Sequence, residues 1–195
     1  MKKQSVLRKI ATVLISLGIF LWLLSLGMPW GRNVIKNPKL RNLENVFNGI
    51  TAAIYSYQDR YHFLPGDVNR NGKIDGTFDS TISSDESRLL WLHLRQAELV
   101  AGDKLNDKQP INLFNGLIGV STDIITADDG SGISGLFIGF TNIPGDVAIK
   151  IESRGDDGKP NSGDIHAQKI TSGVATNIEN YSENGLYNLY FLFGI

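Results

Sequence analysis

Apolar side chains follow three different patterns along this chain, and each pattern predicts a different kind of element. Residues 10–30 are apolar almost throughout. From Leu40 onward, apolar residues recur at steps of three and four, which is the period of an amphipathic helix; they are Leu43, Val46, Phe47, Ile50, Ile54, Tyr57 and Tyr61. Residues 111–195 carry short β-rich runs separated by Gly, Asn and Asp, which is typical of antiparallel strands.

The apolar segment 10–30 has the length of a membrane-spanning helix. At about 1.5 Å per residue it reaches roughly 30 Å, the thickness of a bilayer core. A cleaved secretory signal usually has a shorter apolar core followed by small residues, and the sequence SLGMPWG fits that pattern poorly. We therefore expect a transmembrane helix at residues 10–30, with the basic residues 1–9 in the cytoplasm and residues 31–195 exported.

The order of the elements predicts the fold class. Helical patterns precede the strand patterns, so we expect an α+β fold in which a long N-terminal helix packs on an antiparallel β-sheet. That helix would have a membrane half and an amphipathic half, and a second short helix would follow it. The final run, YNLYFLFGI, fits either a core strand or an exposed edge, and we favour the core strand. Within the exported part we predict a helix at 40–63, a loop at 64–82, a helix at 84–101 and the sheet at 111–195.

Charge and cysteine content narrow the range of functions. All 20 acidic residues and 15 of the 19 basic residues follow residue 30, which gives that part a formal charge of −5. Binding to a phosphate backbone needs clustered Lys and Arg, so we expect no nucleic-acid partner. The chain has no cysteine, which excludes disulfide bonds, metal thiolates and thiol catalysis.

The segment DVNRNGKID contains the spacing of a calcium-binding loop. Oxygen ligands at positions one, three, five, seven and nine, with glycine at six, let one tight turn direct several oxygens at a single cation. Position twelve is Phe78 where such loops have a bidentate Glu, although Asp79 or Glu86 could supply that carboxylate. The alternative is a turn rich in Asn and Asp with local hydrogen bonds. The candidate ligands are Asp67, Asn69, Asn71, the backbone carbonyl of Lys73, and Asp75.

The remaining chemical candidates are weaker. The sequence RGDDGKPNSGD at 154–164 fits a second metal loop, an Arg-Gly-Asp recognition site or a polar loop between two strands, and we favour the polar loop. The adjacent acids at 128–129 and 156–157 are typical of solvated turns. No nucleophile motif accompanies the three histidines, so we expect that the protein is not an enzyme; they are His62, His93 and His166.

Four blocks of the chain resemble type IV pilin-like proteins, which include the pseudopilins of type II secretion. YSYQDRYHFLPGD looks like the family's tyrosine-spaced helix end, and NGKIDG with ESRLLWLHLRQAELVAG resembles the loop and helix of one subgroup. INLFNGLIGV is similar to that subgroup's Asn-Pro-Phe-Gly-Gly segment. IPGDVAIKIESRGDDGKPNSGDIHA is similar to its Asp-Asp-Gly-x-Pro-x-x-Gly run.

The resemblance implies a structural subunit, a minor pilin or pseudopilin-like component of a type IV pilus or type II secretion-like assembly. It implies a place in the bacterial inner membrane, with other pilin-like subunits, inner-membrane assembly proteins and membrane lipid as partners. The start of the chain departs from the family, because Leu7 and Thr12 occupy the places of the processing Gly and the Glu. The alternative is an unassembled membrane-anchored recognition module that binds a ligand, and calcium, through its loops.

Overall fold

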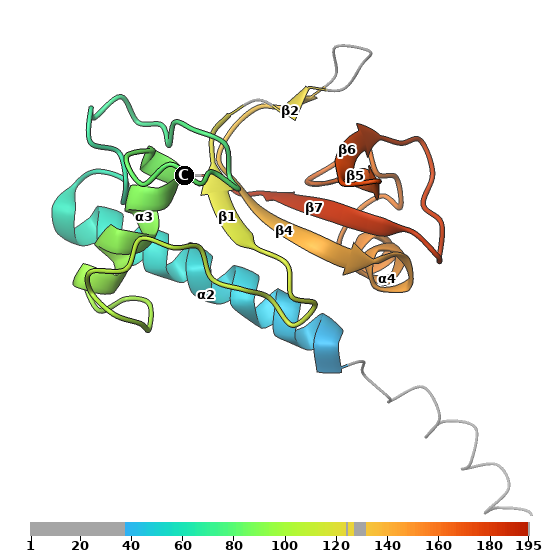
Figure 1. Cartoon of the computed structure of the whole chain (residues 1–195), viewed down its shortest axis with the longest axis horizontal. Helices are drawn as coiled ribbons and strands as arrows, with labels where there is room; N and C mark the ends of the chain where they lie inside the picture. Colours follow the sequence, from blue (N-terminus) through green and yellow to red (C-terminus); the bar gives the residue numbers. More distant parts are fainter. Residues whose placement is uncertain (1–37, 124, 127–131, 195) are drawn as a thin grey trace, which may run out of the picture. The chain divides into compact units, whose positions relative to one another are not determined.

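The computed structural model describes residues 38–123, 125–126 and 132–194, which form an α+β fold (Figure 1). A five-stranded antiparallel sheet has the strand order β1-β4-β7-β5-β6, and a small separate ladder joins β2 to β3. The helices among these residues are α2 (Pro38–Tyr61), α3 (Glu86–Gln96) and α4 (Gly145–Gly155). The strands are β1 (Ile118–Ser121), β2 (Ile125–Thr126), β3 (Gly132–Ile133), β4 (Phe137–Pro144), β5 (Ile165–Thr171), β6 (Val174–Asn177) and β7 (Leu186–Leu192).

The last strand, β7, lies in the middle of the large sheet. It pairs with β4 on one side and with β5 on the other, both antiparallel. Its residues Tyr187, Leu189 and Tyr190 are buried. The prediction of a core strand at the end of the chain is therefore confirmed. Because β4 and β5 flank β7, the chain must leave the sheet after β4, and it does so through α4 (Figure 1).

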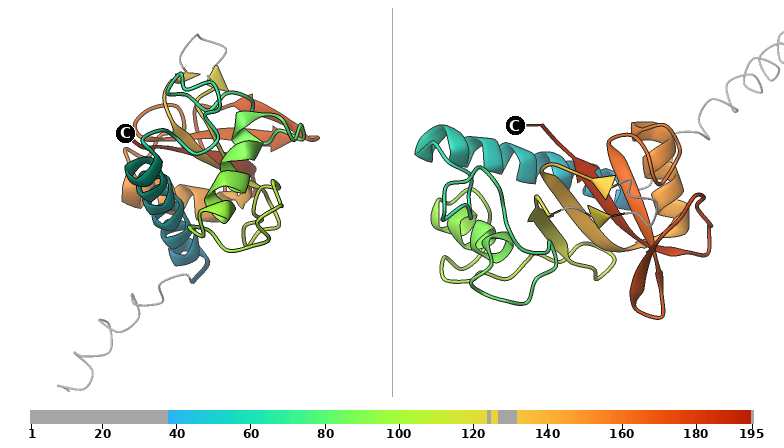
Figure 2. Two further views of the ribbon diagram at one scale, coloured as in Figure 1. Left: turned by 90° about the vertical axis from the view of Figure 1, so that its left-hand side faces the viewer. Right: turned by 90° about the horizontal axis from the view of Figure 1, so that it is seen from above.

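Helix α2 lies along the sheet and buries one stripe of its surface (Figure 2). Leu43, Ile50 and Ile54 are buried at the spacing that the sequence predicted. The ring of Phe47 lies 5.3 Å, centroid to centroid, from that of Phe191 at the end of β7. Only one end of the predicted stripe differs, because Tyr61 is 45 % exposed.

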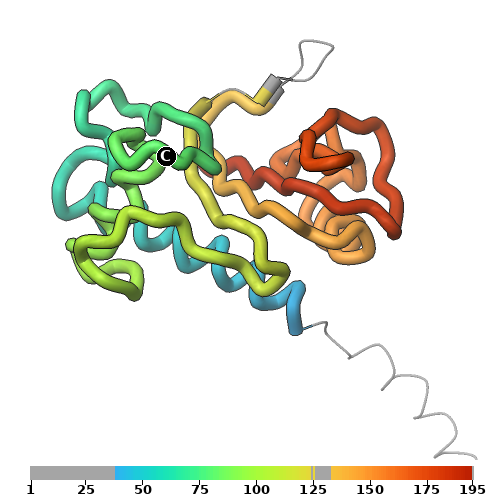
Figure 3. The backbone as a smooth tube through the Cα atoms, in the orientation of Figure 1, coloured from blue at the N-terminus to red at the C-terminus, as the bar shows by residue number. Residues whose placement is uncertain are grey.

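The segment between α2 and α3 connects both helices to the edge of the sheet (Figure 3). The N–H of Thr122 donates to the carbonyl of Ile74 at 3.0 Å, and the hydroxyl of Ser121 donates to the carbonyl of Gly76 at 2.7 Å. Ile74 of this segment and Trp91 on α3 are both fully buried in the same hydrophobic core. The segment thus packs as part of the core, although it contains no regular element.

The predicted fold is wrong in its helices. The first described helix begins at Pro38, and none of the helices in the described ranges is both long and apolar enough to cross a bilayer. The transmembrane helix predicted at 10–30 lies outside the described residues. The second predicted helix, 84–101, is confined to Glu86–Gln96, and a third helix, α4, occupies residues within the predicted sheet at 111–195.

Helix α4 was mistaken for a strand because VAIKIES is rich in β-branched residues. Its buried residues Val147, Ala148 and Ile151 nevertheless share one helical face. Pro144 precedes the helix in extended conformation, and Asp146 in the first turn interacts favourably with the helix dipole. Helix-starting residues and tertiary packing have outweighed the local β preference.

Candidate functional site

The predicted calcium loop folds as one tight turn around the carboxylate of Asp67. This side chain is only 2 % exposed. Its Oδ1 accepts a hydrogen bond from the N–H of Asn71 at 3.0 Å, and its Oδ2 accepts one from the N–H of Gly72 at 2.9 Å. Gly72 has φ +77°, a conformation that favours glycine, and this explains the residue at position six of the loop.

The two asparagines of the loop make the hydrogen bonds of an Asx turn. The Oδ1 of Asn69 accepts from the N–H of Asn71 at 2.9 Å, and the Oδ1 of Asn71 accepts from the N–H of Lys73 at 2.8 Å. Their side-chain amides donate to Oδ2 of Asp75, at 3.2 Å and 3.1 Å. The structure therefore brings Asp67, Asn69, Asn71 and Asp75 into one turn. Calcium binding by this turn stays a prediction.

Glu86, the first residue of α3, accepts hydrogen bonds from the backbone of this loop. Its carboxylate is 5 % exposed, and Oε1 accepts from the N–H groups of Val68 at 3.0 Å and Asn69 at 3.4 Å. Oε2 accepts from the N–H of Asp75 at 3.0 Å. Asp85 is the N-cap residue of α3, so Glu86 lies in the first turn of the helix. Of the two distant carboxylates considered at the sequence level, Glu86 is the one that contacts the loop.

Gly66 joins the loop to α3 at a point with no room for a side chain. Its φ is +91°, and a Cβ there would meet the carbonyl oxygen of Glu86 and lie 2.9 Å from the N atom of Leu90. The N–H of Gly66 donates to Nδ1 of His93 at 2.9 Å. Burial lowers the pKa of His93, which favours the neutral ring that this acceptor role requires. We call Gly66, Asp67, Glu86 and His93 the loop clasp.

A groove of about 650 Å³ borders the loop clasp. Tyr61 and Phe63 supply apolar surface, and the guanidinium of Arg70 lies 5.0 Å from the centroid of the Phe63 ring. Arg70 and His62 both have positive φ values, so the chain bends sharply on each side of this surface. Aromatic rings beside a cation can contact a ligand, so this groove is a candidate binding surface.

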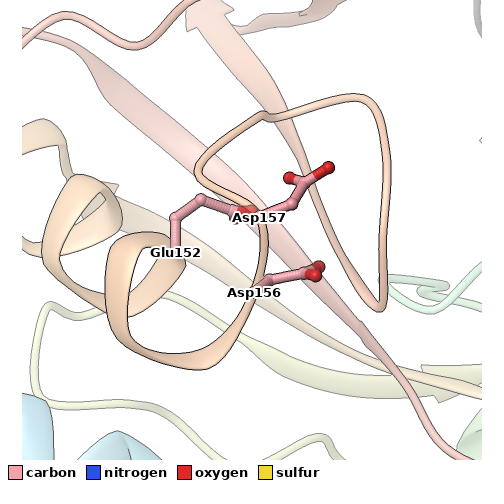
Figure 4. Close-up of side chains that lie close together, drawn as sticks. All are labelled: Glu152, Asp156 and Asp157. Carbon is pink, nitrogen blue, oxygen red and sulfur yellow. The ribbon is translucent and has the colours of Figure 1, made fainter.

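A second acidic group lies at the end of α4 (Figure 4). One carboxylate oxygen from each of Glu152, Asp156 and Asp157 lies within 4.8 Å of the other two. We call these residues the α4 acidic cluster. The sequence indicated Asp156 and Asp157 as acids of a polar loop, but Glu152 was missed because its segment was interpreted as a strand. The loop follows a helix, so the predicted connection between two strands is wrong.

The histidines and the Arg-Gly-Asp sequence are not brought into one site. His62 is exposed at the end of α2, and His166 on β5 has Nε2 3.2 Å from the carbonyl of Gly163. Asp156 of the Arg-Gly-Asp sequence accepts from the N–H of Ile165 at 2.7 Å, so its carboxylate is used within the domain. Asp128 and Asp129 lie outside the described residues.

Comparison of the chain with protein-family models, with curated proteins and with solved structures found no match. Function must therefore be inferred from the residues and their contacts. The described residues supply two sites that contain buried carboxylates in contrasting surroundings, the loop clasp and the α4 acidic cluster.

Proposed function

We propose that the protein is a non-catalytic structural subunit, anchored by residues 10–30 in the bacterial inner membrane, of a type IV pilus or type II secretion-like assembly. The domain that follows would be periplasmic or extracellular, and the N-terminus cytoplasmic. Neighbouring subunits and inner-membrane assembly proteins are the expected partners, with contacts between apolar anchors. The sequence of residues 10–30 and the four blocks of resemblance suggest this function.

The observation that carries the proposal is how the loop clasp uses its polar groups. Both oxygens of Glu86 accept backbone N–H groups, and Nδ1 of His93 accepts another. In an active site, such groups would be directed at a reacting atom. Here they hold the chain between α2 and α3 in one conformation, which suits a domain that is carried as a rigid building block.

The block around Asn112 has the same character. Its Oδ1 accepts from the N–H of Phe114 at 2.8 Å and of Gly116 at 3.1 Å, while Nδ2 donates to the carbonyl of Thr141 at 2.8 Å. A Cβ on Gly116 would collide with that same carbonyl. The residues that carry the resemblance in this block thus serve to attach a turn to β4. This favours a structural function over catalysis.

Crosslinking through the anchor tests the proposal. The chain has no cysteine, so Leu17→Cys introduces a single thiol in the middle of residues 10–30. If anchors pack together in an assembly, oxidation of membranes that contain this variant gives a disulfide-linked dimer. Leu105→Cys is the matched control, because Leu105 is 84 % exposed in a loop of the domain and should stay monomeric. Intact mass, measured on the same sample, reports whether the N-terminus is processed.

The opposite result is equally informative. A Leu17→Cys variant that fractionates with membranes, reacts with a thiol reagent and remains monomeric would contradict assembly. That outcome would favour the solitary recognition module, whose candidate binding surface is the groove beside Tyr61 and Phe63. Cleavage near Trp30 would release the domain and would also contradict the proposal.

A further inference from the structure

The α4 acidic cluster contains a buried carboxylate that the protein itself leaves half unsatisfied. Glu152 is 1 % exposed. Its Oε2 accepts from the hydroxyl of Tyr181 at 2.9 Å, whereas the buried Oε1 accepts no hydrogen bond. Buried polar atoms are almost always paired, and an unpaired carboxylate oxygen is among the most costly exceptions. Figure 4 shows Glu152 directed toward the segment that carries Asp156 and Asp157.

Burial changes the pKa of Glu152. Desolvation raises the pKa of Glu152 to about 7, and the charges of Asp156 and Asp157 add to the shift. The Tyr181 hydroxyl and the nearby Gly158 amide oppose it only in part. Three carboxylates within 4.8 Å repel one another, so the folded domain gathers negative charge here without a balancing group inside the cluster.

The two aspartates are held in place by their own neighbours. Oδ2 of Asp156 accepts from the N–H of Ile165 at 2.7 Å, and Oδ2 of Asp157 accepts from the hydroxyl of Ser162 at 2.6 Å. A Cβ on Gly163, which has φ +83°, would collide with the carboxylate of Asp156. Both carboxylates are therefore oriented by the loop, and each oxygen retains a lone pair for a further ligand.

The nearby cations do not neutralise the cluster. Arg154 is directed to Glu44 on α2, with Nη2 3.5 Å from Oε1. The hydroxyl of Ser162 and then the backbone N–H of Lys159 are the main causes that lower the pKa of Asp157, and the charges of the Lys159 and His166 side chains make smaller contributions. These two side chains thus influence the exposed edge of the cluster, while the buried oxygen of Glu152 stays without a partner.

We propose that Glu152, Asp156 and Asp157 bind a divalent cation, with Ca²⁺ preferred over Mg²⁺. Calcium takes oxygen ligands at about 2.4 Å, so two ligands of one ion lie at most about 4.8 Å apart, which the three carboxylates satisfy. Mg²⁺ usually keeps most of its water and uses one or two carboxylates. The ion enters past the exposed Asp157, pairs with Oε1 of Glu152, and water completes its coordination.

Such an ion would connect three parts of the fold. It joins the last turn of α4 to the loop before β5, and through the Glu152–Tyr181 hydrogen bond it also stabilises the segment that leads into β7. The inference goes beyond the proposed function and is independent of it, because an ion here would stabilise the domain whether or not the protein assembles.

Calorimetric titration of the full chain in detergent with Ca²⁺, after removal of metal with a chelator, tests the site. Glu152→Gln and Asp157→Asn each remove one ligand charge, and we expect either to weaken Ca²⁺ binding about tenfold or more. Asp164→Asn is the matched control, because it is an exposed acid of the same loop outside the cluster, and its affinity should stay within about twofold. Asp75→Asn, in the other loop, should also retain this binding event.

Terbium provides a second readout that a merely structural defect would not mimic. Tyr181 contacts Glu152 directly, so it should sensitise the luminescence of Tb³⁺ bound in the cluster. Tyr181→Phe should reduce that emission while Ca²⁺ still raises the thermal midpoint. The proposal is overturned if the wild type binds no Ca²⁺ at millimolar concentration, if Glu152→Gln and Asp157→Asn bind as the wild type does, or if Asp75→Asn alone abolishes binding.

Discussion

Two buried glutamates, Glu86 in the loop clasp and Glu152 in the α4 acidic cluster, differ in how their charge is compensated. They are 5 % and 1 % exposed, so burial alone does not separate them. Glu86 accepts three backbone N–H groups, whereas Glu152 accepts the Tyr181 hydroxyl, has only the Gly158 amide nearby, and faces two more acids. The pKa of Glu152 is raised to about 7 by this environment.

The difference shows how a structural carboxylate is told apart from a candidate ligand. Backbone N–H groups satisfy the hydrogen-bonding capacity of a buried carboxylate as long as the protein is folded. Neighbouring acids and an unpaired oxygen instead leave negative charge uncompensated, and a bound cation can compensate it. The comparison predicts that substitution of Glu86 destabilises the domain, while substitution of Glu152 changes its response to ions and pH.

The largest effect is expected for Glu86→Ala. It leaves the N–H groups of Val68 and Asp75 without their acceptor, and each buried unsatisfied group costs about 1–3 kcal/mol. We expect the free energy of unfolding, measured with urea, to fall by about 3 kcal/mol or more. Glu98→Ala is the control, because it removes an exposed glutamate that is paired with Lys104. Its urea unfolding midpoint should equal that of the wild type. Equal losses of unfolding free energy in both variants would contradict the stabilising role of Glu86 in the loop clasp.

The next effect distinguishes steric crowding from backbone strain at glycine. Gly66→Ala should cost about 2–4 kcal/mol, because φ is +91° and the new Cβ would lie 2.9 Å from the N atom of Leu90. Gly72→Ala has a similar φ of +77° but meets no atom within 4 Å, so only about 1 kcal/mol is expected. Urea midpoints of the two variants give the contrast directly. Equal losses would mean that backbone strain, not close packing against α3, requires glycine at 66.

Much of this contrast lay beyond what the sequence could predict, for a physical reason. The stripe on α2 and the buried strand at the end of the chain follow from local patterns, which are encoded in adjacent residues. The Asp67 turn was also predicted, since its hydrogen bonds join residues four and five apart. The role of Glu86 depends on contacts with residues 11 to 18 positions away, which local patterns do not encode.

The α4 acidic cluster was missed through one wrong assignment of secondary structure. In a strand, Glu152 would lie far from Asp156, because the chain between their positions would be fully extended. In a helix it lies one turn before Asp156, whose N–H donates to the carbonyl of Glu152. The four-residue spacing of Glu152 and Asp156, after the Pro-Gly-Asp start at 144–146, was the signal available in the sequence.

An intermediate effect, of opposite sign, is expected for Glu152→Gln when no divalent cation is present. The folded pKa of about 7 lies above the ordinary 4.5, so wild-type stability should fall as pH rises from about 4.5 to 7. At about pH 8 the amide should raise the free energy of unfolding by about 1–2 kcal/mol, since it removes a buried charge. Saturating Ca²⁺ should reverse the order of the two proteins. A variant less stable than the wild type in chelator would show that the carboxylate is already satisfied.

The loop clasp should respond to pH in the opposite direction. The folded pKa of His93 is lowered from 6.5 by burial, so its contribution is present above pH 6.5 and is lost as pH falls toward that lower value. As pH falls below about 6.5, the wild type should lose stability that His93→Asn does not lose. Urea unfolding at several pH values measures both proteins, and identical slopes for His93→Asn and wild type would contradict the role of neutral His93.

The smallest effect is expected for Asp75→Asn, which tests the calcium prediction for the loop itself. Oδ2 of Asp75 accepts the amides of Asn69 and Asn71, so in chelator the variant should lose less than about 1 kcal/mol of stability. If the loop binds Ca²⁺, two carboxylates make it the weaker site, and the wild type should show a second binding event that Asp75→Asn removes. A wild type with one binding event, unaffected by Asp75→Asn, would mean that the Asx turn is complete without an ion. The contrast would then be between Glu86, both of whose carboxylate oxygens accept backbone N–H groups, and Glu152, whose buried Oε1 accepts none.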